Sequence, residues 1–93
     1  MTYEIVRTKQ FRKDVKQMIR RGKDDHTLER ILRLLANGDK LPSSNRDHAL
    51  TGNYIGFREC HIEPDWLLIY CYIQSQLVLV CSRTGTHSDL FDK

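Results

Sequence analysis

The hydrophobic positions in the first half of the chain recur at helical spacing. Apolar side chains three and four positions apart form one stripe over residues 8–21 and another from Asp24 or Asp25 to Asn37–Gly38. Thr8 and the aspartates are residue types that cap helix N-termini. The pattern predicts an opening strand at 3–7, followed by two helices that form an antiparallel hairpin. The predicted buried stripes are Phe11, Val15, Met18 and Ile19, then Leu28, Ile31, Leu32 and Leu35.

In the second half the pattern changes to that of β-strands. Residues 54–63 alternate, residues 66–73 are almost continuously apolar, and residues 77–82 form a last β-prone run. The alternation places Phe57, Glu59, His61 and Glu63 on one face, and Arg58, Cys60 and Ile62 on the other. Pro64 and Asp65 favour a tight turn, residues 84–86 break the last strand, and 88–91 can form one helical turn.

This element order predicts an α+β fold with a single domain over residues 1–93. The order is β-α-α-β-β-β with a short terminal helix, and the helical hairpin packs on a largely antiparallel four-stranded sheet. Residues 38–53 are rich in Gly, Pro, Ser, Asn and Asp and predict a long loop that carries His48. Loops of this length in a compact domain usually face a ligand.

Composition narrows the class of protein. No apolar run approaches the roughly 20 residues that cross a bilayer, and no secretory signal precedes the first strand, so we expect a cytoplasmic protein with no membrane partner. Cys60, Cys71 and Cys81 lack paired spacing, which argues against disulfides and structural zinc. They are expected to be small buried hydrophobic residues.

Charge is distributed unevenly along the chain. The net charge of +3 divides into +6 for residues 1–46, with 12 Lys/Arg and 6 Asp/Glu, and −3 for residues 47–93, with 3 and 6. One face of the first helix carries a basic stripe, which could be a solvated surface or could bind a polyanion. The basic stripe consists of Lys9, Lys13, Lys16 and Arg20.

Three histidines in the acidic half are candidates for proton transfer. His48 lies on the loop, His61 near a strand end and His87 just past the last strand, so an antiparallel sheet can bring them to one edge. Asp65 is close in sequence to His61 and can share that edge. The sequence His61-x-Glu63-x-Asp65 also offers metal ligands, but its spacing matches no zinc motif. We expect no metal and no cofactor.

Three segments at close spacing resemble the YafQ branch of the RelE-type toxins. They are D-H-x-L-x-G at 47–52, H-x-E-P-D-W at 61–66 and R-T-G-T-H at 83–87, followed by Leu90-Phe91. Length, the basic hairpin and strand order extend the resemblance over most of the chain. Ala49, Tyr54 and Cys60 depart from residues common in the family.

The resemblance implies a bacterial type II toxin that is inhibited by a cognate antitoxin. Its activity would be that of a ribosome-dependent, metal-independent endoribonuclease that cuts mRNA in the A site, by attack of the ribose 2′-OH on phosphorus. The functional positions carried over are His48, His61, Asp65, Trp66, His87 and Phe91.

Physical requirements suggest how these residues divide the reaction. His87 is expected to be the principal acid, His61 or Asp65 the base, and His48 a helper at the phosphate. Arg83 could stabilise charge or anchor the last strand, and Trp66 and Phe91 would stack on the splayed nucleotide. The alternatives are a non-catalytic RNA- or protein-binding module on the same fold, and a metal-dependent hydrolase.

Overall fold

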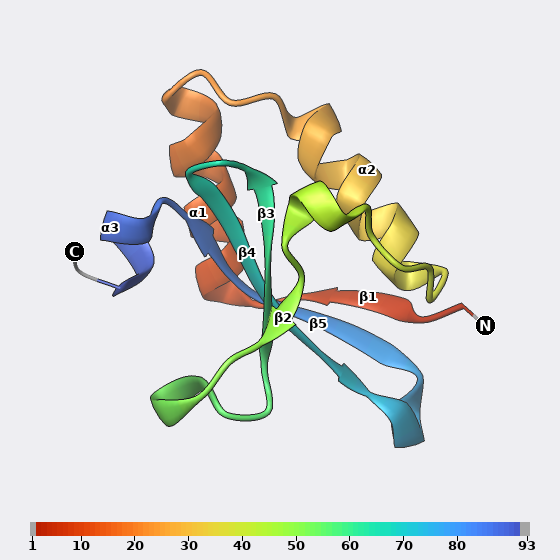
Figure 1. The fold of residues 1–93 in the computed structure, drawn as a ribbon. Coiled ribbons are helices and arrows are strands. Elements are labelled where there is room, and N and C mark those ends of the chain that lie inside the picture. Colours follow the sequence, from red (N-terminus) through yellow and green to blue (C-terminus); the bar gives the residue numbers. More distant parts are fainter. Residues whose placement is uncertain (1, 92–93) are drawn as a thin grey trace.

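A computed structural model describes residues 2–91. The chain forms a five-stranded sheet, and both long helices pack on one face of it (Figure 1). The sheet order is β1-β5-β4-β3-β2, in which β1 runs parallel to β5 and all other neighbours are antiparallel. The strands are β1 (Glu4–Arg7), β2 (His48–Ala49), β3 (Arg58–Glu63), β4 (Trp66–Ile73) and β5 (Val78–Gly85), and the helices are α1 (Lys9–Arg20), α2 (Asp25–Ala36) and α3 (His87–Phe91). Short 3₁₀ turns occupy Ser43–Asn45, Gly52–Tyr54 and Gln74–Gln76.

The predicted α+β class and largely antiparallel sheet are confirmed, but the strand count of four was too low. The loop predicted at 38–53 contains β2, whose His48 and Ala49 pair with Glu59 and Arg58 of β3. A two-residue strand is too short to show an alternating pattern, so only its pairing reveals it. The last strand also continues to Gly85, three residues further than predicted.

Both long helices begin where the capping residues indicate. The Thr8 hydroxyl accepts the Phe11 N–H at the start of α1, and the Asp24 carboxylate accepts the His26 N–H at the start of α2. The predicted stripe of α2 is buried throughout. In α1, however, Ile19 is 45% exposed, whereas Asp14 is only 6% exposed.

Asp14 is buried because it pairs with β5. Its carboxylate accepts Arg83 Nε at 2.7 Å and Nη2 at 3.3 Å, and it also accepts the backbone N–H of Thr84 at 3.2 Å. A buried carboxylate is tolerated only with such compensation. The contact joins α1 to the part of β5 that extends beyond β1.

The central strand β4 separates two apolar clusters, as its continuous apolar sequence predicts. Leu68 and Tyr70 face the helices together with Phe11, Met18 and the α2 stripe. Leu67 and Ile69 point to the opposite face, where Leu90 of α3 covers them. The short helix α3 therefore belongs to the face of the sheet that α1 and α2 leave uncovered (Figure 1).

The predicted alternation of β3 holds as far as Ile62, which is buried with Cys60 in the core under the helices. The strand register shifts between His61 and Glu63, so that His61 pairs with Leu67 but Glu63 pairs with Trp66. Glu63 accepts Lys23 Nζ at 2.7 Å, in the connection between α1 and α2. The prediction that Glu63 shares the face of His61 is therefore wrong, because a bulge turns the end of the strand.

The cysteines are free. Cys60 and Cys81 are buried, as expected of small hydrophobic residues, and Cys71 is half-buried. Burial raises the pKa of the Cys81 thiol to about 12, so this side chain stays a protonated packing residue at neutral pH. Within residues 2–91, no helix is long and apolar enough to cross a membrane.

Candidate active site

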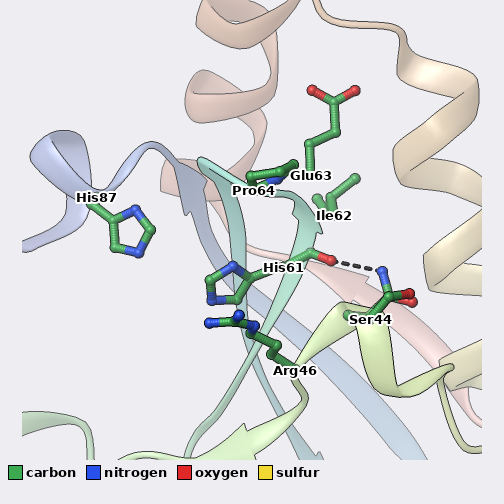
Figure 2. Close-up of a pocket in the computed structure, with 8 residues that line it drawn as sticks. Ser44, Arg46, His61, Ile62, Glu63, Pro64 and His87 are labelled. Carbon is green, nitrogen blue, oxygen red and sulfur yellow. Dashed lines mark hydrogen bonds between the residues drawn. The ribbon is translucent and has the colours of Figure 1, made fainter.

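A cavity of about 580 Å³ opens between the end of β3, the loop before β2 and the start of α3. Figure 2 shows His61 and His87 approaching it from two different elements. Its lining is Ser44, Asn45, Arg46, His61, Ile62, Glu63, Pro64 and His87. The cavity therefore joins residues from three separate parts of the sequence.

His87 is held by Asp65 from the β3–β4 turn. Asp65 Oδ1 lies 2.6 Å from His87 Nδ1 and also accepts the His87 backbone N–H at 3.0 Å. These hydrogen bonds lower the pKa of Asp65, the backbone one most, so the group is a carboxylate at neutral pH. A carboxylate accepts from a protonated Nδ1, which leaves Nε2 as the ring nitrogen available to a ligand.

His61 lies next to His87 across the cavity. The two ring centroids are 5.6 Å apart and the ring planes are inclined at 64°. The His61 side chain is 16% exposed, so most of its ring is enclosed by protein. Asn45 Nδ2 donates to the His61 carbonyl at 2.7 Å and fixes the loop against this strand.

His48 is connected to His61 through a buried carboxylate. Glu59 Oε1 lies 3.5 Å from His48 Nε2 and 3.6 Å from His61 Nε2, and the Glu59 side chain is 7% exposed. His48 Nδ1 lies 2.7 Å from the Arg46 carbonyl, which only accepts, so Nδ1 is the donor. His48 therefore borders the site and does not line the cavity.

Sequence reasoning did not single out Glu59. Its position two residues before His61 on an alternating strand places both side chains on one face, which was the available signal. The contact of Glu59 with His48 could not be predicted from β3 alone. It arises because β2 pairs with β3 and places His48 opposite Glu59.

The orientation of α3 is fixed by a capping box. Thr86 Oγ1 accepts the Asp89 N–H at 3.2 Å, and Asp89 Oδ2 accepts the Thr86 N–H at 2.9 Å. Arg21, at the end of α1, binds the same carboxylate at 2.6 Å. A Cβ atom on Gly85 would lie 2.9 Å from the Asp89 Cβ, so a residue without a side chain is needed there. His87 thus lies inside a rigid turn.

We expect the free energy of unfolding to decrease as the pH falls below about 4, in part because Asp89 becomes protonated. Arg21 and the Thr86 N–H lower the Asp89 pKa from 3.8 to about 2, so its contribution is complete above the unfolded value and is lost as pH falls toward 2. The carboxylate is partly open to solvent, so we expect about 1 kcal/mol. Urea denaturation of wild type and Asp89→Asn should therefore differ at pH 7 and converge near pH 2.

The exposed Asp39→Asn variant is the control for general effects of pH. A gap between wild type and Asp89→Asn that stays constant from pH 7 to pH 2 would contradict the role of the charge.

Two predicted substrate-binding residues are used for structure instead. Trp66 is 1% exposed, and its indole N–H donates to the Thr84 hydroxyl at 2.9 Å, so it offers no face for a base. The expectation that Trp66 stacks on a nucleotide is wrong, because it begins the central strand and points into the helix-covered core. Arg83 is bound to Asp14, which fits the strand-anchor alternative and not the catalytic one.

Phe91 remains available to a ligand. It is half-buried, one helical turn after His87, and its ring lies 5.9 Å edge-to-face from Tyr54. A second, shallow cavity of about 530 Å³ is lined by Thr51, Asn53, Tyr54, Leu90 and Phe91. The short helix therefore presents His87 to one cavity and Phe91 to the other.

The four residues of the basic stripe are all exposed on α1. The C-terminal end of α1 contacts α3 through Arg21 and Asp89, so the last residue of the stripe, Arg20, directly precedes the residue that binds the helix carrying His87. This placement is compatible with the predicted contact to a polyanion.

The candidate metal ligands are not brought together. Asp65 is hydrogen-bonded to His87, and Glu63 forms an ion pair with Lys23. Figure 2 shows the Glu63 side chain pointing away from the His61 ring. Among residues 2–91, no group of three or more His, Cys, Asp and Glu side chains is arranged to hold a metal ion.

Comparison with known proteins identifies the family. Residues 3–92 match the family described as bacterial toxin of type II toxin-antitoxin system, YafQ. The mRNA interferase toxin YafQ of Escherichia coli strain K12 is 43% identical over 83 residues, covering 88% of both chains. That name denotes an endoribonuclease, which confirms the enzyme class that the resemblance implied.

Solved structures agree with this assignment. A chain of the E. coli DinJ–YafQ complex has a TM-score of 0.86 and 41% identity, covering 96% of this chain and 98% of that one. A metal-bound toxin from Helicobacter pylori has a TM-score of 0.90 and 37% identity, covering 98% of this chain and 100% of that one. The chain therefore belongs to the YafQ family of bacterial toxins of type II toxin–antitoxin systems.

Proposed function

We propose that this protein is a ribosome-dependent, metal-independent endoribonuclease that cuts mRNA by attack of the 2′-OH. The observation that carries the proposal is the pair of imidazoles at one cavity, His61 and His87, of which His87 is oriented by Asp65. Two such rings can exchange protons with a bound ribose phosphate near neutral pH.

The reaction needs one base and one acid. The base removes the proton of the 2′-OH, and the 2′-oxygen forms a bond to phosphorus as the bond to the 5′-oxygen breaks. The acid protonates that departing oxygen, which leaves a 2′,3′-cyclic phosphate and a free 5′-OH. The attacking and departing oxygens lie on opposite sides of phosphorus, so the two proton carriers must approach it from opposite sides, which His61 on β3 and His87 on α3 could do.

The contacts of Asp65 support one division of the roles. Its Oδ1 accepts both the backbone and ring hydrogens of His87, so it acts as the orienting carboxylate. His61 is then the base and His87 the acid, while His48 supports His61 through their shared neighbour Glu59. Because the orienting carboxylate fixes Nδ1 as a donor, the reactive nitrogen of His87 is Nε2.

Nucleotide positioning falls to Phe91 and Tyr54. Their rings meet edge-to-face at the second cavity, which leaves part of the Phe91 ring exposed. Single-stranded RNA is commonly bound by stacking unpaired bases on such rings, at about 1–3 kcal/mol per base. A base on Phe91 would lie one helical turn from the acid on His87.

The solved complex of a relative supports a proposal about the partners. The E. coli relative is found in a complex with the antitoxin DinJ, and we propose that a cognate antitoxin likewise binds and inhibits this protein. We also propose that it acts in the cytoplasm on mRNA in the ribosomal A site.

The deciding experiment is translation-dependent cleavage of mRNA by protein that has been stripped of metal with EDTA and then freed of the chelator, because the ribosome itself requires Mg²⁺. The stripped protein should cut a translated mRNA on the ribosome, leave naked mRNA intact, and yield cyclic phosphate and 5′-OH ends. Loss of cleavage after stripping, restored by adding back a transition-metal ion, would favour a metal-dependent hydrolase. Tight binding without cleavage would favour the alternative, a non-catalytic binding module.

The basic stripe gives a separate prediction about docking. Changing Lys13 and Lys16 to Glu should weaken association with ribosomes by about 10-fold or more at low salt, because each phosphate contact releases counterions. The loss should shrink as salt is raised, and sedimentation with ribosomes at several salt concentrations measures it. Equal association of variant and wild type would make the stripe a solvated surface.

A further inference from the structure

The cation that sequence reasoning assigned to the site is not available there. Arg83 is bound in bidentate fashion to Asp14, Lys23 to Glu63 at 2.7 Å, and Arg21 to Asp89 at 2.6 Å. A guanidinium or ammonium already paired with a carboxylate contributes little net charge to a ligand nearby. The positive charge that a phosphate needs must come from elsewhere.

Arg46 is the cation that lines the cavity. It shares the lining with His61 and His87, and Figure 2 shows its side chain extending from the loop toward the His61 ring. In the part of the chain that the structure describes, Arg46 forms no ion pair. Arg46 is an exposed residue, and its guanidinium carries several N–H donors that can bind a ligand.

The backbone holds Arg46 in a costly conformation. Its φ of 48° and ψ of 45° lie in the left-handed region, which costs about 1–2 kcal/mol for a residue with a side chain. Two hydrogen bonds maintain this conformation. The Arg46 N–H donates to the Ser43 carbonyl at 3.1 Å, and His48 Nδ1 donates to the Arg46 carbonyl at 2.7 Å. Asn45, the preceding residue, is fixed to the His61 carbonyl.

We propose that Arg46 binds a phosphate oxygen of the substrate in this cavity, as the charge-stabilising residue beside His61 and His87. The inference rests on the proposed function, since the phosphate is that of the RNA being cut. Arg presents two parallel N–H donors to a phosphate, and those donors would neutralise the charge that develops on its oxygens. The hydrogen bond from His48 to its carbonyl would make His48 a positioning residue for Arg46 as well.

The test compares Arg46→Asn, Arg46→Lys and a matched control, Arg30→Gln, on the exposed face of α2. Asn tolerates the left-handed backbone, so the first variant removes the charge without disturbing the loop. Lys keeps the charge but not the paired donors. Far-UV circular dichroism and urea denaturation establish that each variant is folded.

Two readouts separate this inference from the proposed function. The first is titration with inorganic phosphate at low salt, followed by NMR signals of His61 and His87. The second is cleavage of mRNA on the ribosome. Arg46→Asn should weaken phosphate binding by about 10-fold or more and cleavage by about 10²-fold, Arg46→Lys should fall between, and Arg30→Gln should match wild type.

The phosphate titration decides the role of Arg46 even if the wild type cuts no mRNA, which would overturn the proposed function alone. Equal phosphate affinities in wild type and Arg46→Asn would overturn the role of Arg46. The role of Arg46 would also be overturned if phosphate left the His61 and His87 signals of the wild-type protein unchanged. The same holds if these signals shifted only at the phosphate concentrations that also shift the signals of the basic stripe.

Discussion

Changing His87 to Ala is expected to lower mRNA cleavage by about 10²–10⁴-fold without unfolding the protein. The ring is 48% exposed, so little packing is lost with it. The backbone N–H of residue 87 still donates to Asp65, and the capping box of α3 does not involve the side chain. Cleavage of translated mRNA and growth arrest on overproduction measure the loss, with urea denaturation as the check on folding.

His26→Ala is the matched control, because this ring is 92% exposed on α2 and far in sequence from the motifs. Its activity should equal that of wild type. Undiminished toxicity of His87→Ala would exclude His87 as the acid. Asp65→Asn sharpens the assignment further: a smaller loss than in His87→Ala is expected of an orienting carboxylate, whereas an equal or greater loss would make Asp65 the base.

Changing Trp66 to Ala is expected to cost about 3–5 kcal/mol of folding free energy. The side chain is 1% exposed in the core beneath the helices, where it opens the central strand, and its N–H donates to Thr84. Urea denaturation at neutral pH measures the loss. Because such domains have about 5–15 kcal/mol of folding free energy in all, this loss would remove a large part of the stability of a 93-residue domain.

Trp66→Leu distinguishes a core residue from a stacking residue. Leu is apolar but has no aromatic face, so it keeps part of the packing and removes any stacking on a base; the lost volume and the lost hydrogen bond to Thr84 should cost about 2–4 kcal/mol of stability. Cleavage should stay close to wild type at a temperature where the variant is folded. Phe91→Ala, by contrast, should reduce cleavage with only a small change in stability. A folded Trp66→Leu variant that no longer cuts mRNA would restore the stacking role.

The helices and the central strand were predictable because their determinants are local. Thr8 and Asp24 cap α1 and α2 where a sequence pattern places them, since an N-cap bonds only to the next few residues. The nearly continuous apolar sequence of β4 predicts burial on both faces of the sheet, whatever the position of this strand among its neighbours. Asp14, in the middle of the α1 stripe, was a visible sign of a buried acid that needs a partner, although nothing local named Arg83.

The motifs contain residues of the candidate site but do not give the task of each residue. His61, His87 and Phe91 lie where a ligand can reach them, because they are near strand ends or past them. Trp66 belongs to the same motif as His61, but a bulge after His61 and the direction of β4 turn its ring into the core. One motif therefore contains both a site residue and a core residue.

By itself the sequence determined the α+β order, the two capped helices, the buried central strand and membership of the toxin family. These follow from periodicity and short motifs, which depend on residues a few positions apart. Only the tertiary structure decided that Asp65 is hydrogen-bonded to His87, that Glu59 lies between His48 and His61, and that, within residues 2–91, Arg46 has no ion-pair partner whereas Arg83 has one. Those outcomes depend on strand register and on ion pairs between residues up to 69 positions apart, which no local pattern specifies.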